Sequence, residues 1–282
     1  MPTPLAGVFS GLSLDTNVNT ASFDGSVTLG GNVNLTRADL GSRVQVKYVV
    51  ANGHVQLIRN NSVVADFAPN ELSADSNSAL ALYTRGSVFG TDLPQETFEL
   101  HVPSIGGVPL TYTRFGTYAK VSVNILNINS SSVNPLIAFV FGQPTSSGSM
   151  PHTGSASYTS DVYGAVVVPN GQNTQFYTLG DGHGSATFSA NFANSTVSTL
   201  ISLDSDGGGD FGDLSGTGSI VSSSSAFHGS LTGAGTGEFT GSFFGPVSSG
   251  SPAEMGYVFQ AQGSGFLAYG NVFGVHASPP PP

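Results

Sequence analysis

Side chains that could hold a metal ion or an anion gather in the first half of the chain. Tyr112 and Tyr118 flank Arg114 in the segment LTYTRFGTYAK, residues 110–120, where aromatic and cationic side chains alternate. His54 follows an Asn-Gly turn, and His101 lies opposite the apolar face of an alternating run over 98–102. Imidazole and phenol groups can ligate iron, and a guanidinium group pairs with carboxylates. Each histidine could also be a solvated strand residue, and the tyrosines could be ordinary strand filling.

A second group of chemically active side chains is acidic. Asp204, Asp206, Asp210 and Asp213 fall within ten residues and are separated mainly by glycines. Calcium prefers roughly six to eight oxygen ligands, which a flexible acidic loop could supply. The spacing is not that of an EF-hand loop, because no glutamate follows at its last position. Two interpretations stand, a long polar hairpin loop and a weak calcium site.

The sequence contains none of the common catalytic motifs. The six histidines are scattered, with no His-x-x-x-His or His-Glu pair, and there is no cysteine. A Gly-x-Ser-x-Gly elbow is absent, and no lysine after position 120 could complete a phosphate-binding loop. Glu238 and Glu254 are interpreted as turn or surface acids. We therefore expect a protein that is not an enzyme and has no preformed zinc site or disulfide.

Charge is divided unevenly along the chain. Residues 1–120 hold nine acidic residues and all seven basic ones, whereas residues 121–282 hold eight acidic residues and no basic one. The basic residues are Arg37, Arg43, Lys47, Arg59, Arg85, Arg114 and Lys120. An anionic ligand would therefore find its counter-charges in the first half. The formal net charge of -10 disfavours nucleic acid and anionic lipid as partners.

The elements that must position these side chains are predicted to be strands. The chain has 38 Gly, 16 Pro and only 9% charged residues, so helix formers are scarce. Alternating residues over 44–50, an Asn-Gly turn and a return over 54–59 predict a β-hairpin. Further strands are predicted at 5–14, 23–35, 62–68, 96–102, 110–126 and 134–142, with a helical turn within 70–85. A linker rich in Gly, Pro and Ser over 142–154 places a domain boundary there.

The second half of the chain predicts a small barrel. About eight strands are expected, at 154–160, 162–168, 184–193, 195–203, 214–221, 226–234, 236–244 and 255–269, and eight strands close a barrel filled by side chains. Ala186, Phe188, Ala190 and Phe192 are expected to face its interior. The predicted organisation is an N-terminal β-rich domain at 1–145, a linker at 146–153, a barrel at 154–276 and a Pro-rich tail at 277–282.

The segment GEFTGSFFGPVSSGSPAEMGYVF, residues 237–259, couples two strands at fixed spacing. Phe239 and Phe243 alternate with Thr240 and Ser242, which predicts a half-buried strand with one polar face. Gly245-Pro246 is expected to end strand pairing, because proline has no amide proton to donate.

This segment resembles the C-lobe barrel of transferrin-binding protein B and its surface-exposed relatives in Gram-negative bacteria. Those proteins carry Gly-x-Phe-(Tyr/Phe)-Gly-Pro followed by Ala-Glu-x-Gly-Gly-x-Phe, and Tyr257 replaces the second glycine of the latter motif. The matching residues are Gly241, Phe243, Phe244, Gly245, Pro246, Ala253, Glu254, Gly256 and Phe259. Weaker similarity over 153–164 and 184–198 extends the resemblance to about 120 of 282 residues.

The resemblance implies an all-β protein with a handle-like N-terminal domain and a C-terminal eight-stranded antiparallel β-barrel. Its layout is similar to secreted haem carriers of the hemophilin type, which implies a hemophore that delivers haem to an outer-membrane receptor. A histidine or tyrosine among His54, His101, Tyr112 and Tyr118 would then ligate the iron, and Arg114 would pair with a propionate.

The alternative is a surface lipoprotein-type module that binds an iron-carrying host protein or acts as an adhesin. Either form is expected to be secreted or held at the outer-membrane surface, exported by a translocator that recognises the barrel. The sequence predicts a mature form with an added start methionine, no transmembrane segment, and a monomer.

Overall fold

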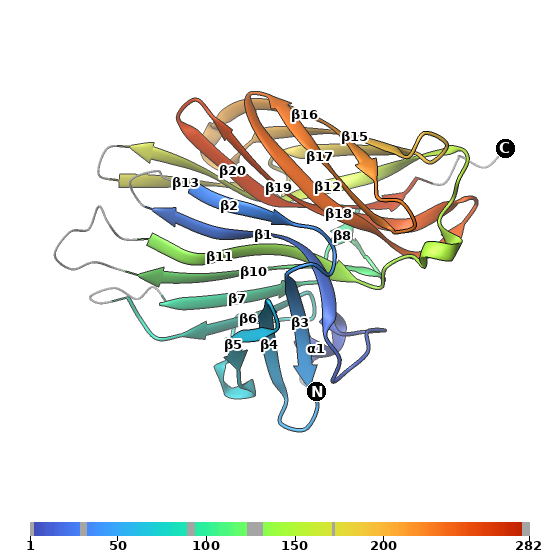
Figure 1. Ribbon diagram of the computed structural model, residues 1–282. Coiled ribbons are helices and arrows are strands. Elements are labelled where there is room, and N and C mark those ends of the chain that lie inside the picture. Colours follow the sequence, from blue (N-terminus) through green and yellow to red (C-terminus); the bar gives the residue numbers. More distant parts are fainter. Residues whose placement is uncertain (1–2, 29–32, 89–93, 123–131, 171–172, 278–282) are drawn as a thin grey trace.

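A computed structural model describes residues 3–28, 33–88, 94–122, 132–170 and 173–277. It confirms the predicted all-β class, because two large antiparallel sheets account for almost all of the regular structure (Figure 1). The part of the predicted tail from 278 onward lies outside the described residues.

The first sheet is built from the first half of the chain. Its strands are β1 (Val18–Thr28), β2 (Val33–Ala38), β3 (Val44–Val49), β4 (His54–Arg59), β5 (Ser62–Phe67), β6 (Leu80–Arg85), β7 (Glu96–His101), β10 (Thr113–Ser122) and β11 (Ser132–Gly142). They are ordered β5-β4-β3-β1-β11-β10-β7-β6, and β2 also pairs with β1. The predicted hairpin over 44–59 is confirmed, since β3 and β4 pair from Val44 opposite Arg59 to Val49 opposite His54.

The first sheet curls until its two edges meet. Phe67 of the edge strand β5 packs on Tyr83 of the opposite edge strand β6, with ring centroids 5.4 Å apart. A 3-10 turn, η1 (Pro69–Glu71), connects these strands and supplies the helical turn predicted within 70–85. A small hairpin of β8 (Ser104–Ile105) and β9 (Val108–Pro109) lies between β7 and β10. The curled sheet encloses its own apolar core, which includes Phe98, Phe139 and Phe141.

Two predictions for the first half are wrong. Residues 5–14 do not form a strand, because the chain there forms helix α1 (Thr3–Val8) followed by turns. Leu5, Val8 and Phe9 are spaced i, i+3 and i+4 and are all buried in the core of the first sheet, which favours the helix. The predicted strand at 23–35 instead covers parts of β1 and β2, which pair antiparallel with each other, and positions 29–32 lie outside the described residues.

The second sheet closes into the predicted eight-stranded barrel. The sheet has nine strands, and all of them except β13 form the barrel. They are β12 (Ser155–Asn170), β13 (Asn173–Leu179), β14 (Ser185–Asn191), β15 (Thr196–Asp204), β16 (Asp210–Ile220), β17 (Ala226–Gly233), β18 (Gly235–Ser248), β19 (Ser251–Gly263) and β20 (Phe266–His276). Pairing of β12 with β20 closes the ring, and β13 is attached beside the second half of β12. Two short 3-10 turns lie in connections along the chain. One, η3 (Ser147–Ser149), is in the segment that links β11 to β12, and the other, η4 (Asp206–Gly208), links β15 to β16.

The number of barrel strands is confirmed, but the strands themselves differ from the prediction. The segments 154–160 and 162–168 form one long strand, β12, and the segment 255–269 is divided between β19 and β20. β13 was not predicted. The interior follows the expected alternation, since Ala186, Phe188, Ala190 and Phe192 are all buried in the barrel core.

The two sheets pack face to face (Figure 1). Phe23 and Val140 of the first sheet meet Phe244 and Val258 of the barrel in one buried cluster. This packing corrects the prediction of a half-buried strand with an exposed polar face. Thr240 and Ser242 do form a polar face, but both are fully buried, because the first sheet covers the outside of β18.

The expected end of pairing at Gly245-Pro246 is also wrong. β18 runs on to Ser248, and the two residues form a bulge between the pairs Phe244–Glu254 and Val247–Pro252. Gly245 has φ +77, and a Cβ there would lie 2.4 Å from Cδ2 of Tyr112. The glycine therefore permits both the backbone turn and the contact between the sheets.

Candidate functional site

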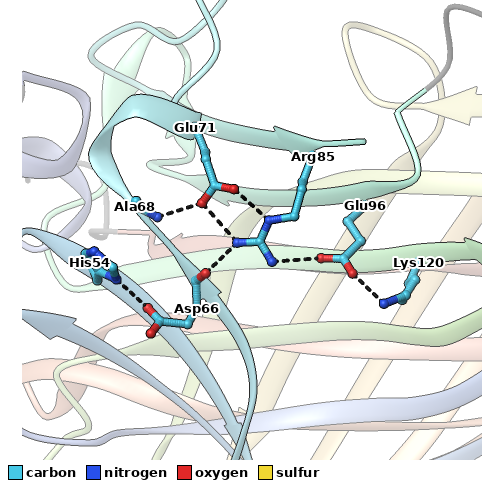
Figure 2. A network of polar contacts seen from close by, with 7 residues as sticks. All are labelled: His54, Asp66, Ala68, Glu71, Arg85, Glu96 and Lys120. Carbon is cyan, nitrogen blue, oxygen red and sulfur yellow. Dashed lines mark hydrogen bonds and ion pairs between the residues drawn. The ribbon is translucent and has the colours of Figure 1, made fainter. Parts of the chain in front are cut away.

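Arg85 is the centre of a polar network across the meeting edges of the first sheet (Figure 2). Its Nε donates to Glu71 Oε1 at 2.6 Å, its Nη1 to Glu96 Oε2 at 3.3 Å, and its Nη2 to the backbone oxygen of Asp66. Lys120 Nζ lies 2.6 Å from the other oxygen of Glu96. The guanidinium carbon also lies 4.5 Å above the ring of Phe67. The network therefore joins the two edge strands β5 and β6, which are not paired with each other in the sheet.

Two predicted site residues belong to this end of the first sheet. His54 Nδ1 lies 2.8 Å from Asp66 Oδ1 (Figure 2). Tyr118 is buried beneath the network and packs on Phe67 and Phe98. Burial raises the pKa of Tyr118 to about 12, with a smaller contribution from Glu96, so its phenol stays protonated at neutral pH. The hydrogen bond from Arg85 lowers the pKa of Glu71.

Arg114 and Tyr112 lie at the seam between the two sheets. Arg114 is buried, and its guanidinium donates to the backbone oxygens of Gly7, Val8, Leu110 and Thr113. Burial lowers the pKa of Arg114. The ring of Tyr112 packs against the bulge at Gly245. Arg114 therefore fastens α1 and the loop before β10 to the first sheet.

Glu254 fastens the same loop to the barrel. Its Oε1 accepts from the amide of Thr111 at 2.7 Å, and its Oε2 accepts from the amides of Tyr112 and Thr113 at 2.9 and 2.8 Å. Only 4% of Glu254 is exposed, so its interpretation as a turn or surface acid is wrong. The reason is tertiary, because a loop more than 140 residues away covers it. Glu238, by contrast, has a side chain that is 47% exposed, beside Arg37.

His101 is the predicted residue that lies beside a cavity between the sheets. Its ring stacks on Phe115, with centroids 4.4 Å apart and planes 8° apart, and lies 4.9 Å from the ring of Tyr163 on β12. Its Nε2 is 3.1 Å from Glu99 Oε2. Glu99 and Tyr163 both line a cavity of about 340 Å³.

The cavity is formed by facing strands of the two sheets. Its lining from the first sheet comes from β7, β10 and β11, and its lining from the second comes from β12, β13 and β20. Asn271 of β20, opposite Tyr163 in the strand register, is 1% exposed, and neither its amide nitrogen nor its oxygen has a hydrogen-bond partner in the described parts of the chain. No motif marks Asn271, so the sequence could not have identified it.

Most of the basic side chains form ion pairs or hydrogen bonds with other groups of the same chain. Ion pairs join Arg43 and Arg59 to Asp24, Arg37 to Asp39 and Glu238, and Arg85 and Lys120 to Glu96. Arg114 is held by backbone oxygens, as described above. Within the described residues, Lys47 is the one basic side chain without an ion pair or hydrogen bond of this kind.

Asp24 is a buried carboxylate that pairs with two of these arginines. Its side chain is fully buried, 3.1 Å from Arg43 Nε and 2.6 Å from Arg59 Nε. Burial raises the pKa of Asp24, and the two arginines oppose that effect.

Two carboxylates of the acidic loop between β15 and β16 accept backbone amides. Asp206 Oδ1 accepts from the amide of Thr178 at 2.6 Å, and Asp210 Oδ1 accepts from the amide of Gly212 at 2.8 Å. Over the described ranges, no group of three or more His, Cys, Asp or Glu side chains is arranged to hold a metal ion. Calcium binding by Asp204, Asp206, Asp210 and Asp213 stays a prediction.

The five residues predicted to bind a cofactor lie in three separate surroundings. His54 and Tyr118 belong to the edge network, Tyr112 and Arg114 to the seam, and His101 to the cavity wall. His101 is three residues from Phe98, the register partner of Tyr118, so His101 and Tyr118 point to opposite faces of the first sheet. The other residues come from different elements, and their separation depends on how those elements pack.

Similar solved structures are those of transferrin binding protein B. A double mutant of this vaccine antigen from Haemophilus parasuis Hp5 matches 92% of the chain at 17% identity and a TM-score of 0.50. The isotype 1 protein from serogroup B Neisseria meningitidis matches 92% at 14% identity and a TM-score of 0.50. HpuA from Kingella denitrificans, solved with human haemoglobin, matches 94% of this chain and 90% of its own at 14% identity and a TM-score of 0.44.

The fold resemblance inferred from residues 237–259 is thereby confirmed. The chain spans 45% and 44% of the length of the two transferrin-binding structures. No family model matches the sequence, and no curated protein matches it. The helices in the described part of the chain are too short or too polar to cross a membrane.

Proposed function

We propose that this chain is an extracellular capture protein, without enzymatic activity, that binds an iron-carrying host protein in bacterial iron acquisition. The transferrin-binding proteins that share its fold bind transferrin according to their name. The observation that favours a protein ligand is that nearly all basic side chains already pair with groups of the same chain. Five of the seven are in ion pairs, and Arg114 is buried among backbone oxygens.

Charge favours a protein ligand over haem, because haem carries two propionates. A guanidinium that already pairs with a buried carboxylate cannot turn to a propionate without leaving that carboxylate unpaired, which is strongly unfavourable. Protein interfaces need no such charge, since their centres are depleted of charged residues. Exposed valines on the β3–β4 and β4–β5 hairpins fit such a surface: Val50, Val63 and Val64 are 51%, 52% and 37% exposed.

Binding of human transferrin and haemoglobin to the immobilised full chain tests the proposal. We expect saturable binding of one of them, weakened at least about tenfold by Val63→Asp, because a charge would be buried in the interface. Val108→Asp is the matched control, since Val108 is 68% exposed on β9, outside these hairpins. Absence of binding to both proteins would remove the proposal, and equal losses in the two variants would remove the hairpins as its site.

Haem is the second candidate, and the position of His101 favours it. His101 packs on both Phe115 and Tyr163 beside the cavity, so an iron ligand and aromatic side chains are close together. Addition of haemin to the full chain should then give a shifted, saturable Soret band that His101→Ala abolishes and His54→Ala retains. An unchanged haemin spectrum in the unmodified protein would eliminate this candidate.

The proposed location is the cell surface or the medium, with the barrel recognised during export and an outer-membrane receptor as the next partner. Fractionation of the producing cells tests it. Recovery of the chain in the cytoplasm alone would contradict an extracellular role.

A further inference from the structure

The cavity between the sheets is a built site with two facing walls. Thr97 and Glu99 of β7 share one face of their strand, and their register partners on β10, Ala119 and Thr117, line the cavity with them. The opposite wall consists of residues on β12 and β20 that face each other in the barrel ladder, Tyr163 with Asn271 and Ala165 with Tyr269.

Apolar contacts between the sheets flank the cavity at both ends. At one end, Phe115 stacks on Phe273 with ring centroids 5.4 Å apart and planes 7° apart. At the other end, Leu136 of the first sheet packs with Val167 and Leu267 of the barrel. The space between them is therefore held open by packed residues on either side.

Asn271 is the observation that points to a ligand. Asn271 belongs to the lining of the cavity, and neither the donor nor the acceptor of its buried side-chain amide is bonded within the described residues. Buried amides are hydrogen-bonded in nearly all native structures, so a bound molecule is expected to complete this one. The amide can both donate to and accept from such a molecule.

The charge of the cavity favours a cation. Glu99 is the one carboxylate in the lining, and no lysine or arginine belongs to it. Glu99 is contacted by His101 at 3.1 Å and by Thr117 Oγ1 at 3.4 Å, neither of which is a permanent cation. Burial raises the pKa of Tyr163 and of Tyr269 to about 12, so both phenols are neutral at physiological pH. The Glu99 carboxylate attracts a cation and repels an anion, and aromatic rings such as these also favour a cation.

We propose that this cavity binds a small organic cation, an ammonium group beside Glu99 and the tyrosines with a hydroxyl or carbonyl that bonds to Asn271. The volume of about 340 Å³ is near the lower end of ligand pockets, which suits a molecule of this size. The proposal goes beyond capture of a host protein, since the cavity and the exposed valine hairpins are separate parts of the molecule.

Titration calorimetry of the full chain with choline and with its uncharged isostere, 3,3-dimethylbutan-1-ol, tests the charge requirement. Choline is expected to bind saturably, and the isostere at least about tenfold more weakly, because it has the shape without the charge. Equal affinity for both would overturn the proposal in favour of an apolar pocket. Absence of binding by choline would overturn it in favour of a water-filled space.

Two variants locate the binding. Glu99→Gln and Asn271→Leu are each expected to weaken choline binding at least about tenfold, and thermal unfolding without ligand checks that both fold. Glu238→Gln is the matched control, because Glu238 lies outside the cavity lining and should leave the affinity unchanged. Unchanged affinity in both cavity variants would place choline elsewhere and overturn the assignment. The response to transferrin or haemoglobin is measured in the same variants and is expected to be unaffected.

Discussion

Glu254→Gln should loosen the junction between the first sheet and the barrel. The carboxylate accepts three amides at 2.7 to 2.9 Å, two of them on Oε2. If the glutamine oxygen takes the place of Oε2, the Tyr112 and Thr113 amides keep neutral bonds, while the Thr111 amide faces an NH₂ group. One lost bond and two bonds without charge assistance amount to about 2 to 3 kcal/mol, the lower part of that range applying if water reaches the exposed Thr111.

Hydrogen exchange of the amides of 111–113 measures this loss directly. A loss of about 2 kcal/mol corresponds to roughly 30-fold faster exchange, provided that these amides exchange by local opening. Glu238→Gln is the control, since this exposed side chain should change stability by less than about 0.5 kcal/mol. Exchange at Tyr112 and Thr113 that stays within about threefold of the unmodified protein, with an unchanged urea midpoint, would refute the role given to Glu254.

Three further outcomes are expected. Gly256→Ala should destabilise the protein by about 1 to 3 kcal/mol in urea unfolding, because the new Cβ would lie 2.6 Å from Val140 Cγ2, whereas Gly148→Ala, with nothing within 4 Å, should be neutral. Arg85→Met should make the free energy of unfolding, measured in urea as a function of pH, fall less steeply as the pH is lowered into the acid range. The lowered pKa of Glu71 contributes stability that is present above the ordinary glutamate pKa and lost as pH falls through the lowered value, so the variants should converge in strong acid. A calcium site at Asp204, Asp206, Asp210 and Asp213 should raise the thermal midpoint by several degrees in millimolar calcium. An unchanged midpoint would leave the polar hairpin loop, in which Asp206 and Asp210 accept backbone amides.

Local pattern was sufficient for much of the fold. The Asn-Gly turn defined the β3–β4 hairpin, and the alternation from Ala186 to Phe192 identified a barrel strand with its inward face. Short apolar runs were less informative. Leu5, Val8 and Phe9 belong to a helix and the turn after it, but an apolar run this short fits a strand as well as a helix, and a strand was predicted.

The candidate site was less predictable than the fold. The histidine and tyrosine side chains were identified by type, but type does not say which face of a strand meets another sheet. His101 lies at the cavity, while Tyr118, from a paired neighbouring strand, lies in the core of the first sheet. Asn271 carries no local signal, and Glu254 is part of the motif in 237–259 but was interpreted as a turn or surface acid.

The sequence by itself determined an all-β chain with a barrel in its second half, because period-two alternation and turn residues act between near neighbours. It also determined where positive charge could lie. Only the tertiary structure decided what those charges and the motif in 237–259 do. Glu254 meets Thr111, and Asn271 faces Glu99 across a cavity, because two sheets formed by distant segments pack together. Whether a polar group is exposed, bonded or left open for a ligand depends on that packing, which no local pattern encodes.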